Sequence, residues 1–204
     1  MPFPSFEHWV KHVLNPKMTT ANPSGYWKFD NETWYKNYQL KYHIAKMIAP
    51  RSILEIGVLY GFSAHAFLCA GESISYLGID INDPSFNDVG EPTLDIAAKM
   101  LNHEVPRVPP AYIETRVCNT QKEELTDLGN YDFVHVDACH TYQGCYRDIR
   151  SAWPHCNRAV LVDDYVTNGG VHDAVDKFIQ DFGATLLITP AISGSQNGEA
   201  LIIR

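Results

Sequence analysis

The sequence predicts an α/β fold in which a doubly wound, mostly parallel sheet of seven strands ends in an antiparallel hairpin. Three observations support this fold. Short apolar runs typical of buried strands alternate with segments of helical periodicity along residues 53–189. A glycine turn directly follows the first of these strands. Finally, the Gly-, Ser- and Asn-rich segment 190–199 is too short for a helical crossover between the last two strands and suits a hairpin.

The elements follow from local patterns in chain order. Residues 7–14 form a short predicted helix, and residues 31–48 a longer one whose aromatic and aliphatic side chains share one face before Pro50 stops it. The first strand begins at Ile53, and the helix after it, 63–70, is expected to end at Gly71 in a left-handed cap. Further strands are predicted at 74–81, 111–118, 131–137, 159–163, 184–189 and 200–204, and further helices at 93–103, 142–153 and 170–182.

Length and composition indicate a single globular domain. The 204 residues suffice for one domain of ordinary size, so we expect a helical N-terminal extension, 1–50, attached to a core, 51–204. Hydrophobic residues make up 45% and charged residues 20% of the chain, which is typical of globular proteins and argues against disorder. Since no apolar run reaches the ~20 residues of a membrane helix and the N-terminus has no signal pattern, we expect a cytoplasmic protein with no membrane partner.

Charge and cysteine content exclude further classes of protein. The formal net charge is -8 and the 16 basic residues form no cluster in the sequence, so we expect no nucleic-acid partner. The five cysteines are odd in number and contain no C-x-x-C pair. This argues against both a disulfide framework and a structural zinc site.

The glycine turn after the first strand has the form of a cofactor site. Gly57 and Gly61 lack the Cβ atom that would keep a cofactor off the backbone, and the next helix, in whose first turn Ser63 lies, offers unpaired N–H groups to an anionic ligand. With Glu55 the spacing is E-x-G-x-x-x-G, which differs from the G-x-G-x-x-G of dinucleotide dehydrogenases. It resembles motif I of the class I methyltransferases that use S-adenosylmethionine (SAM). The resemblance implies a Rossmann-like fold and SAM as cofactor, held by these four residues.

An acidic residue at the end of the second strand fits the same kind of site. Asp80 lies close to the roughly 20-residue offset at which nucleotide-binding α/β proteins place a carboxylate that binds ribose hydroxyls. Alternatively, Asp80 caps the turn that Asn82, Asp83 and Pro84 favour by composition. With the glycine turn before it, we interpret Asp80 as a ribose-binding residue.

Three aspartates follow two later strands, at the sheet edge where open α/β folds hold their ligands. Asp137 ends the strand 131–137, Asp163 ends the strand 159–163, and Asp164 directly follows it. Three carboxylates that converge there could bind one cation, and oxygen ligands of this kind suit Mg2+. Alternatively, Asp137 and Asp163 are ordinary strand-end residues, and Asp164 caps the next turn.

A histidine three residues beyond Asp137 has the chemistry of a general base. His140 begins the next helix, and an imidazole with an ordinary pKa of about 6.5 can remove a proton near neutrality. Methyl transfer to a hydroxyl needs such a base because a neutral alcohol is a poor nucleophile. The alternative is a helix-start histidine bonded to the backbone. By contrast, His135 falls within a strand and is expected to be a core residue.

The second half of the chain contains a longer pattern, D-x-x-H-x-Y-x-G-x-x-x-D, followed by D-D-Y. The pattern is filled by Asp137, His140, Tyr142, Gly144 and Asp148, then by Asp163, Asp164 and Tyr165. It resembles the small-molecule O-methyltransferases related to the macrolide-sugar methyltransferases and the cephalosporin-hydroxylase group, over about residues 50–204. The resemblance implies Mg2+ on the three aspartates, His140 as base, Asp137 in the catalytic centre, and a homo-oligomer. The chain departs from the family pattern at Ala138 and Cys139, where D-G-x-H is usual. It also departs at residues 154–158, where K-P-G-G is usual, and we expect this second difference to change only a turn.

Further candidate binding residues come from loops. Asn119 and Thr120, with Gln121, follow the third strand, where such enzymes contact adenine, although an ordinary polar loop is the alternative. Tyr26 and Trp27 follow Pro23-Ser24-Gly25 and so lie in a loop of the aromatic-rich N-terminal segment, where they could line a substrate pocket. An oligomer contact and ordinary core packing are the alternatives for the aromatic residues of this segment. Tyr165 is the third candidate substrate residue.

These observations favour a SAM-dependent methyltransferase that acts on a hydroxyl of a small, secondary-metabolite acceptor with the help of Mg2+ and a histidine base. Two alternatives stay open: a metal-independent N- or O-methyltransferase, and a non-catalytic SAM or nucleotide binder on the same fold. A nicotinamide dehydrogenase is disfavoured by the glycine spacing.

Overall fold

The computed structural model describes residues 2–13, 32–86, 91–105, 108, 111–189 and 198–204, and contains one seven-stranded sheet of order β3-β2-β1-β4-β5-β7-β6. The first five strands run parallel, and β7 is antiparallel to both of its neighbours, β5 and β6. The predicted parallel sheet with a C-terminal hairpin is therefore confirmed. The strands are β1 (Ser52–Ile56), β2 (Ser75–Asp80), β3 (Ile113–Val117), β4 (Tyr131–Val136), β5 (Cys156–Val162), β6 (Thr185–Ile188) and β7 (Ala200–Ile203).

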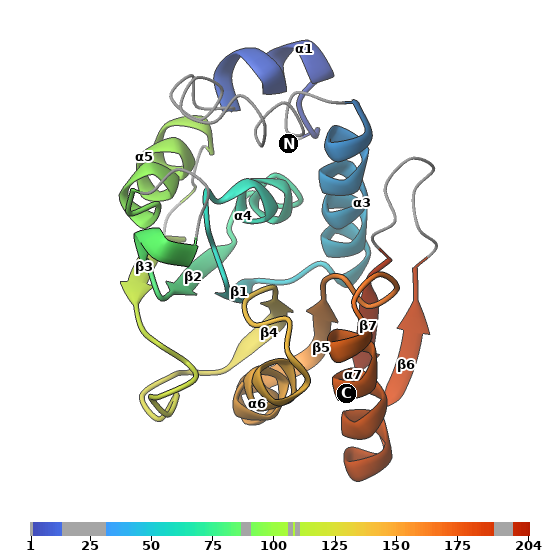
Figure 1. Cartoon of the computed structure of the whole chain (residues 1–204). Coiled ribbons are helices and arrows are strands. Elements are labelled where there is room, and N and C mark those ends of the chain that lie inside the picture. Colours follow the sequence, from blue (N-terminus) through green and yellow to red (C-terminus); the bar gives the residue numbers. More distant parts are fainter. Residues whose placement is uncertain (1, 14–31, 87–90, 106–107, 109–110, 190–197) are drawn as a thin grey trace.

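Helices cover both faces of the sheet, as expected when right-handed crossovers join parallel strands (Figure 1). On one face lie α3 (Glu32–Ile48), α4 (Phe62–Leu68) and α5 (Leu94–Glu104); on the other lie α6 (Tyr142–Ala152) and α7 (Gly169–Phe182). Short 3-10 turns occupy Pro84–Phe86 and Trp153–His155. None of the helices in the described ranges has the combined length and apolarity needed to cross a membrane.

The central strand β1 is buried on both faces because successive side chains point to opposite sides of the sheet. Ile53 packs with Phe67 and Phe133 in the cluster beneath α3 and α4, whereas Leu54 packs with Phe178 in the cluster beneath α6 and α7. Glu55 follows the same alternation and points to the side of Ile53. This direction determines its partners, described below.

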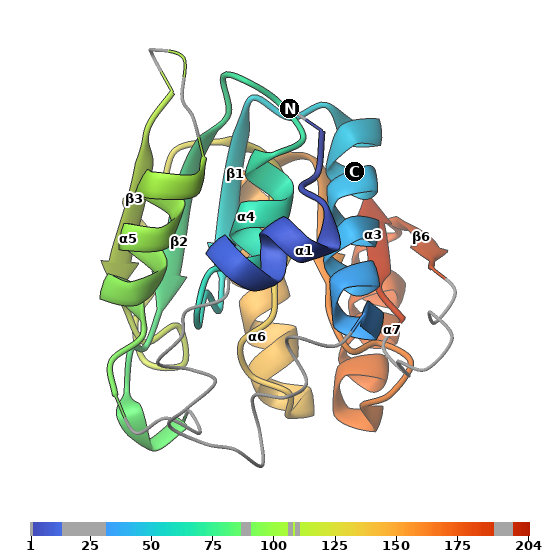
Figure 2. The same ribbon diagram turned by 90° about the horizontal axis from the view of Figure 1, so that it is seen from above.

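The N-terminal segment crosses the outer side of the helices α3 and α4 (Figure 2). The predicted helix 7–14 is divided into α1 (Phe6–His8) and a π-helical turn, η1 (Trp9–Val13), with Leu14 outside the described residues. Trp9 is fully buried, with its ring centroid 5.6 Å from that of Tyr38 and 5.7 Å from that of Phe62. Since both partners line the cavity described next, the segment supports one wall of the site.

Two local predictions were wrong. Gly71 does not cap α4 in a left-handed conformation; the cap residue is Cys69, in a right-handed helical conformation. The segment 154–158 is not merely a turn, because β5 begins at Cys156 and pairs with β4 from that residue onward. Asn157 and Arg158 are exposed, so their polarity concealed the start of the strand.

Candidate functional site

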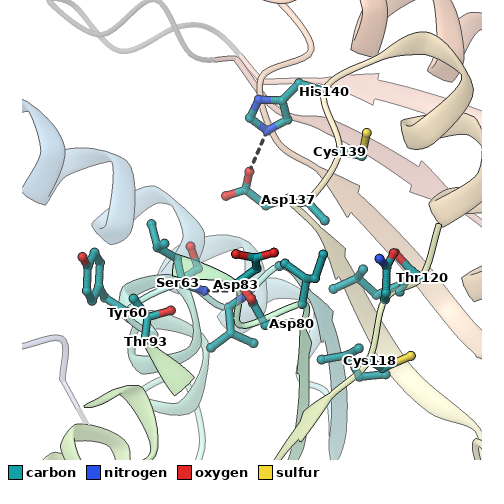
Figure 3. Close-up of a pocket in the computed structure, with 18 of the residues that line it drawn as sticks. Tyr60, Ser63, Asp80, Asp83, Thr93, Cys118, Thr120, Asp137, Cys139 and His140 are labelled. Atoms are coloured by element: carbon teal, nitrogen blue, oxygen red, sulfur yellow. Dashed lines mark hydrogen bonds and ion pairs between the residues drawn. The ribbon is translucent and has the colours of Figure 1, made fainter. Parts of the chain in front are cut away.

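A cavity of about 580 Å3 opens at the carboxyl ends of the parallel strands (Figure 3). Its volume lies in the range of small-molecule sites. Seven predicted site residues line it, namely Gly57, Ser63, Asp80, Asn119, Thr120, Asp137 and His140. In Figure 3, His140 and Asp137 lie on one side of the cavity, and Ser63 and Asp80 on the other.

Gly57 brings the ends of β1 and β4 together. Its φ of 90° lies in the left-handed region, and its N–H donates to the Ile79 carbonyl at 2.8 Å. A Cβ atom on Gly57 would stand 2.0 Å from the carbonyl oxygen of Asp137, well inside van der Waals contact. The glycine is therefore required by contact within the protein, in addition to any approach of a cofactor.

Gly61 lies in the turn between β1 and α4, as predicted, and packs against α5. Its φ is 80°, and a Cβ atom there would stand 3.1 Å from the Cβ of Ala97 on α5. Gly61 does not line the cavity, whereas Ser63, in the first turn of α4, does. Gly61 thus has a packing role at the start of α4, and its cofactor contact stays a prediction.

Asp80 organises the turn that follows β1. Its Oδ2 accepts from the backbone N–H groups of Val58 at 2.8 Å and Leu59 at 2.9 Å, and its Oδ1 accepts from the N–H of Asn82 at 2.6 Å. A carboxylate has about four acceptor sites, so these bonds leave roughly one for a ligand hydroxyl. The turn role is observed, and the ribose role stays a prediction for a residue that lines the cavity.

Glu55 does not bind a cofactor in this arrangement. Its side chain is fully buried, accepts a hydrogen bond from the Tyr76 hydroxyl and pairs with Nδ1 of His135 at 2.8 Å. The residue does not line the cavity, because the alternation of β1 turns its side chain into the layer between α3 and the sheet. The predicted cofactor role of Glu55 is corrected accordingly, whereas His135 is a core histidine as predicted.

His140 lies between two carboxylates. Its Nε2 is 3.3 Å from Oδ1 of Asp137, and its Nδ1 is 3.7 Å from Oδ2 of Asp164. The next residue, Thr141, caps α6 by accepting from the N–H of Gly144 at 3.2 Å. This cap fixes the backbone position of His140. The hydrogen bond to Asp137 raises the pKa of His140 to about 9. Burial and the Asp163 carboxylate raise the pKa of Asp137 to about 6.

The three predicted magnesium ligands do not form one set. In the described part of the chain, the group of three metal-binding side chains whose ligand atoms lie within 4.8 Å of one another is His135, Asp163 and Glu199, which contains one of the predicted aspartates. Both oxygens of Asp163 are engaged: Oδ1 accepts from the N–H of Asp164 at 3.0 Å, and Oδ2 is 3.1 Å from Nζ of Lys41. This geometry does not fit a Mg2+ ion held jointly by Asp137, Asp163 and Asp164.

Tyr165 is a core residue rather than a substrate residue. It is 5% exposed, its hydroxyl donates to Oδ1 of Asp176 on α7 at 2.8 Å, and its ring stacks on His172. The predicted substrate contact is therefore corrected to a link between the loop after β5 and α7. The other two candidates, Tyr26 and Trp27, lie outside the described residues.

Asn119 and Thr120 lie where the sequence placed them, on the cavity wall after β3. The neighbouring Gln121 donates to Oδ1 of the buried Asp148 at 2.8 Å and so ties this loop to α6. Burial raises the pKa of Asp148 to about 6. The last aspartate of the D-x-x-H pattern thus anchors the loop predicted to contact adenine.

Sequence reasoning missed two charged residues beside the site, Lys41 and Glu199. Both are buried, and their side chains pair at 2.7 Å. The available signal was that Lys41 shares the helix face of Tyr38, Tyr42 and Ala45, which marks a lysine on a buried surface. No comparable local signal marks Glu199.

Comparisons with known proteins agree on one class of fold. A family model described as a methyltransferase domain matches residues 54–165. The search of curated proteins found no match.

Solved structures of methyltransferases are similar along most of the chain. The O-methyltransferase from Bacillus cereus in complex with SAH matches with a TM-score of 0.62 and 15% identity, covering 100% of this chain and 94% of that one. The O-methyltransferase TomG from Streptomyces achromogenes, involved in tomaymycin synthesis and in complex with SAM, matches with a TM-score of 0.59 and 17% identity, covering 98% and 99%. The SAH-bound methyltransferase PaMTH1 from Podospora anserina matches with a TM-score of 0.62 and 16% identity, covering 99% and 89%. At these identities the likeness shows the fold.

Proposed function

Because the chain belongs to the family of methyltransferase domains, we propose that it transfers the methyl group of SAM to a hydroxyl of a small-molecule acceptor. The observation that carries this proposal is one cavity lined both by the glycine turn with Asp80 and by the pair Asp137 and His140. A cofactor on the first set and an acceptor beside the second would face each other within the same cavity. We also propose a secondary metabolite as acceptor and a homo-oligomer, as the resemblance implies, and a cytoplasmic location, as expected from the sequence.

The reaction is an in-line displacement in which His140 removes a proton. As the acceptor oxygen attacks the methyl carbon, the carbon–sulfur bond breaks, its electron pair stays on sulfur, and SAH is released. The acceptor proton passes to Nδ1 of His140, since Nε2 is held by Asp137 at 3.3 Å, whereas Asp164 lies 3.7 Å from Nδ1. Asp137 and Asp164 orient the ring and stabilise the imidazolium that forms. Orientation and proton removal supply the acceleration.

Magnesium on Asp137, Asp163 and Asp164 stays a sequence prediction, and no step above uses it. A hydroxyl acceptor is favoured over an amine by His140, because a base is needed where the nucleophile must lose a proton first. Chelator-resistant transfer to amines alone would select the N-methyltransferase alternative. SAM binding without turnover on any acceptor would select the non-catalytic binder.

A change at Asp80 tests the cofactor half of the proposal. We expect Asp80→Asn to raise the dissociation constant of SAH at least tenfold, because the amide nitrogen replaces an acceptor with a donor at the one position left for a ligand hydroxyl. Isothermal titration calorimetry measures this, with Asp95→Asn, an exposed residue of α5, as the matched control. Wild-type protein that binds NAD and neither SAM nor SAH would overturn the proposal.

The titration of His140 tests the base. Its neighbouring carboxylates favour the charged form, so the ring is expected to titrate at a pKa of about 9 and to be largely protonated at pH 7. NMR of the ring protons between pH 6 and 10 measures this pKa without an acceptor. Asp164→Asn removes one of the negative charges that raise it, so the midpoint should move to lower pH. Turnover should rise with pH over the same range, because only the neutral ring accepts a proton. A midpoint at or below 6.5 would contradict the close approach of Asp137 and Asp164 to the ring.

A further inference from the structure

Lys41 is a buried lysine on the inner face of α3. Its side chain is 3% exposed, and Tyr38, Tyr42 and Ala45 on the same face are also buried. Lysine is almost never fully buried unless its charge is paired. The residues around Nζ therefore determine what this side chain does.

The Lys41 ammonium has a partner for each of its three N–H groups. Nζ lies 2.7 Å from Oε1 of Glu199, 3.1 Å from Oδ2 of Asp163 and 3.3 Å from Nε2 of His135. An ammonium has three donors and no acceptor, so this set uses its full hydrogen-bonding capacity. The same three side chains form the group, in the described ranges, whose ligand atoms lie close enough together to hold a metal ion. The ammonium nitrogen thus occupies the position between them that an ion would need.

One of the three partners, His135, is held in place by a second contact on its far side. Nδ1 of His135 pairs with Oε1 of Glu55, whose other oxygen accepts from the Tyr76 hydroxyl. Because the Lys41 ammonium can only donate, Nε2 of His135 is assigned as its acceptor, and Nδ1 of the neutral ring is then the protonated nitrogen that faces Glu55. Burial and the Lys41 charge hold the pKa of His135 well below its usual range, which agrees with a neutral ring.

The same cation is connected to the proposed base. Asp163, which Lys41 contacts, lies close enough to Asp137 for its charge to raise the pKa of Asp137, and Asp137 is paired with Nε2 of His140. Burial alone would lower the pKa of Lys41, but the carboxylates of Asp163 and Glu199 hold this pKa above its usual range. Positive charge is therefore already present behind the aspartates that the sequence assigned to Mg2+.

We propose that the Lys41 ammonium is the resident cation of this acidic site, and that the protein consequently takes up no divalent metal there. This inference rests on the proposed function only for the identity of the reaction, and that reaction then proceeds without a metal. It corresponds to the metal-independent form of the methyltransferase. Lys41 acts as a positioning residue, since it contacts Asp163 and not the proposed reacting atoms.

The test is the binding of Mn2+, a paramagnetic probe for Mg2+, to the SAH-saturated full chain, followed by electron paramagnetic resonance. We expect no stoichiometric binding to wild type, and about one equivalent bound by Lys41→Met, in which His135, Asp163 and Glu199 lose their cation. Lys36→Met, on the exposed side of α3, is the matched control and should behave as wild type. A merely structural lysine would not create a metal site when removed.

Two outcomes would overturn the inference. One is an equivalent of Mn2+ bound by wild type that Asp164→Asn weakens at least tenfold, which would establish the aspartate site predicted from the sequence. The other is a folded Lys41→Met protein that gains no Mn2+ site. If Lys41→Met does not fold, the wild-type titration alone decides. Neither readout measures methyl transfer, so the first outcome would leave the proposed function intact in its magnesium-assisted form.

Discussion

Replacing Gly57 by alanine is expected to lower the stability of the protein by at least about 3 kcal/mol and its melting temperature by roughly 6–12 °C. Two costs combine in this variant. Alanine at a φ of 90° is strained, and its Cβ would stand 2.0 Å from the Asp137 carbonyl oxygen. Backbone atoms cannot rotate away as a side chain does, so the end of β4 must move relative to β1.

The same displacement should weaken cofactor binding. Gly57 and Asp137 both line the cavity, so we expect the affinity of Gly57→Ala for SAH to fall at least tenfold. Calorimetric melting and SAH titration measure the two effects. Gly169→Ala is the control, because a Cβ at this first residue of α7 meets no atom within 4 Å. It should stay within about 0.5 kcal/mol of wild type. A melting temperature for Gly57→Ala within 2 °C of wild type would mean that the close approach of β1 and β4 is not as described.

Replacing His140 by glutamine is expected to reduce kcat by roughly 10²- to 10⁴-fold, the usual contribution of a general base. Glutamine keeps the size and hydrogen-bonding ability of the side chain but cannot take up the acceptor proton near neutral pH. Since His140 is 43% exposed and its backbone is fixed by the Thr141 cap, the fold and the affinity for SAH should change little.

The measurement is steady-state turnover of SAM to SAH with the first acceptor found in a screen of hydroxylated compounds. The control is His103→Gln, whose side chain is 83% exposed on α5. The variant should retain the wild-type rate. His140→Gln that keeps more than a tenth of wild-type kcat would remove the histidine from the reaction and leave Asp137 as the remaining candidate.

The fold could be predicted because each element carries its own local pattern. The buried runs of β1, β2 and β4, and the glycine turn after β1, report their structure without reference to distant residues. Asp137 and His140 were found for the same reason, since they follow β4 directly and a strand end in a parallel sheet has a known position.

The rest of the site depends on pairings that no local pattern contains. Lys41 meets Asp163 and Glu199 only through the way α3 packs on the sheet, which sets a helix register that sequence spacing does not define. Glu55 was misinterpreted because an acid next to a glycine turn suggests a ligand contact. Its actual partner, His135, lies on the adjacent strand, and that pairing became known only with the sheet order.

The pairing of β1 with β4 also governs how the chain can fold. Glu55 and His135 are register partners separated by 80 residues, and this pairing joins β1, β2 and β3 to the remaining strands. Closing so long a loop costs entropy before any contact compensates it, so this joint is expected to form late. The cavity takes its walls from both sides of the joint. A cofactor can therefore bind only after β1 has paired with β4. Cofactor present in the cell would increase the folded fraction of a destabilised variant without accelerating its folding.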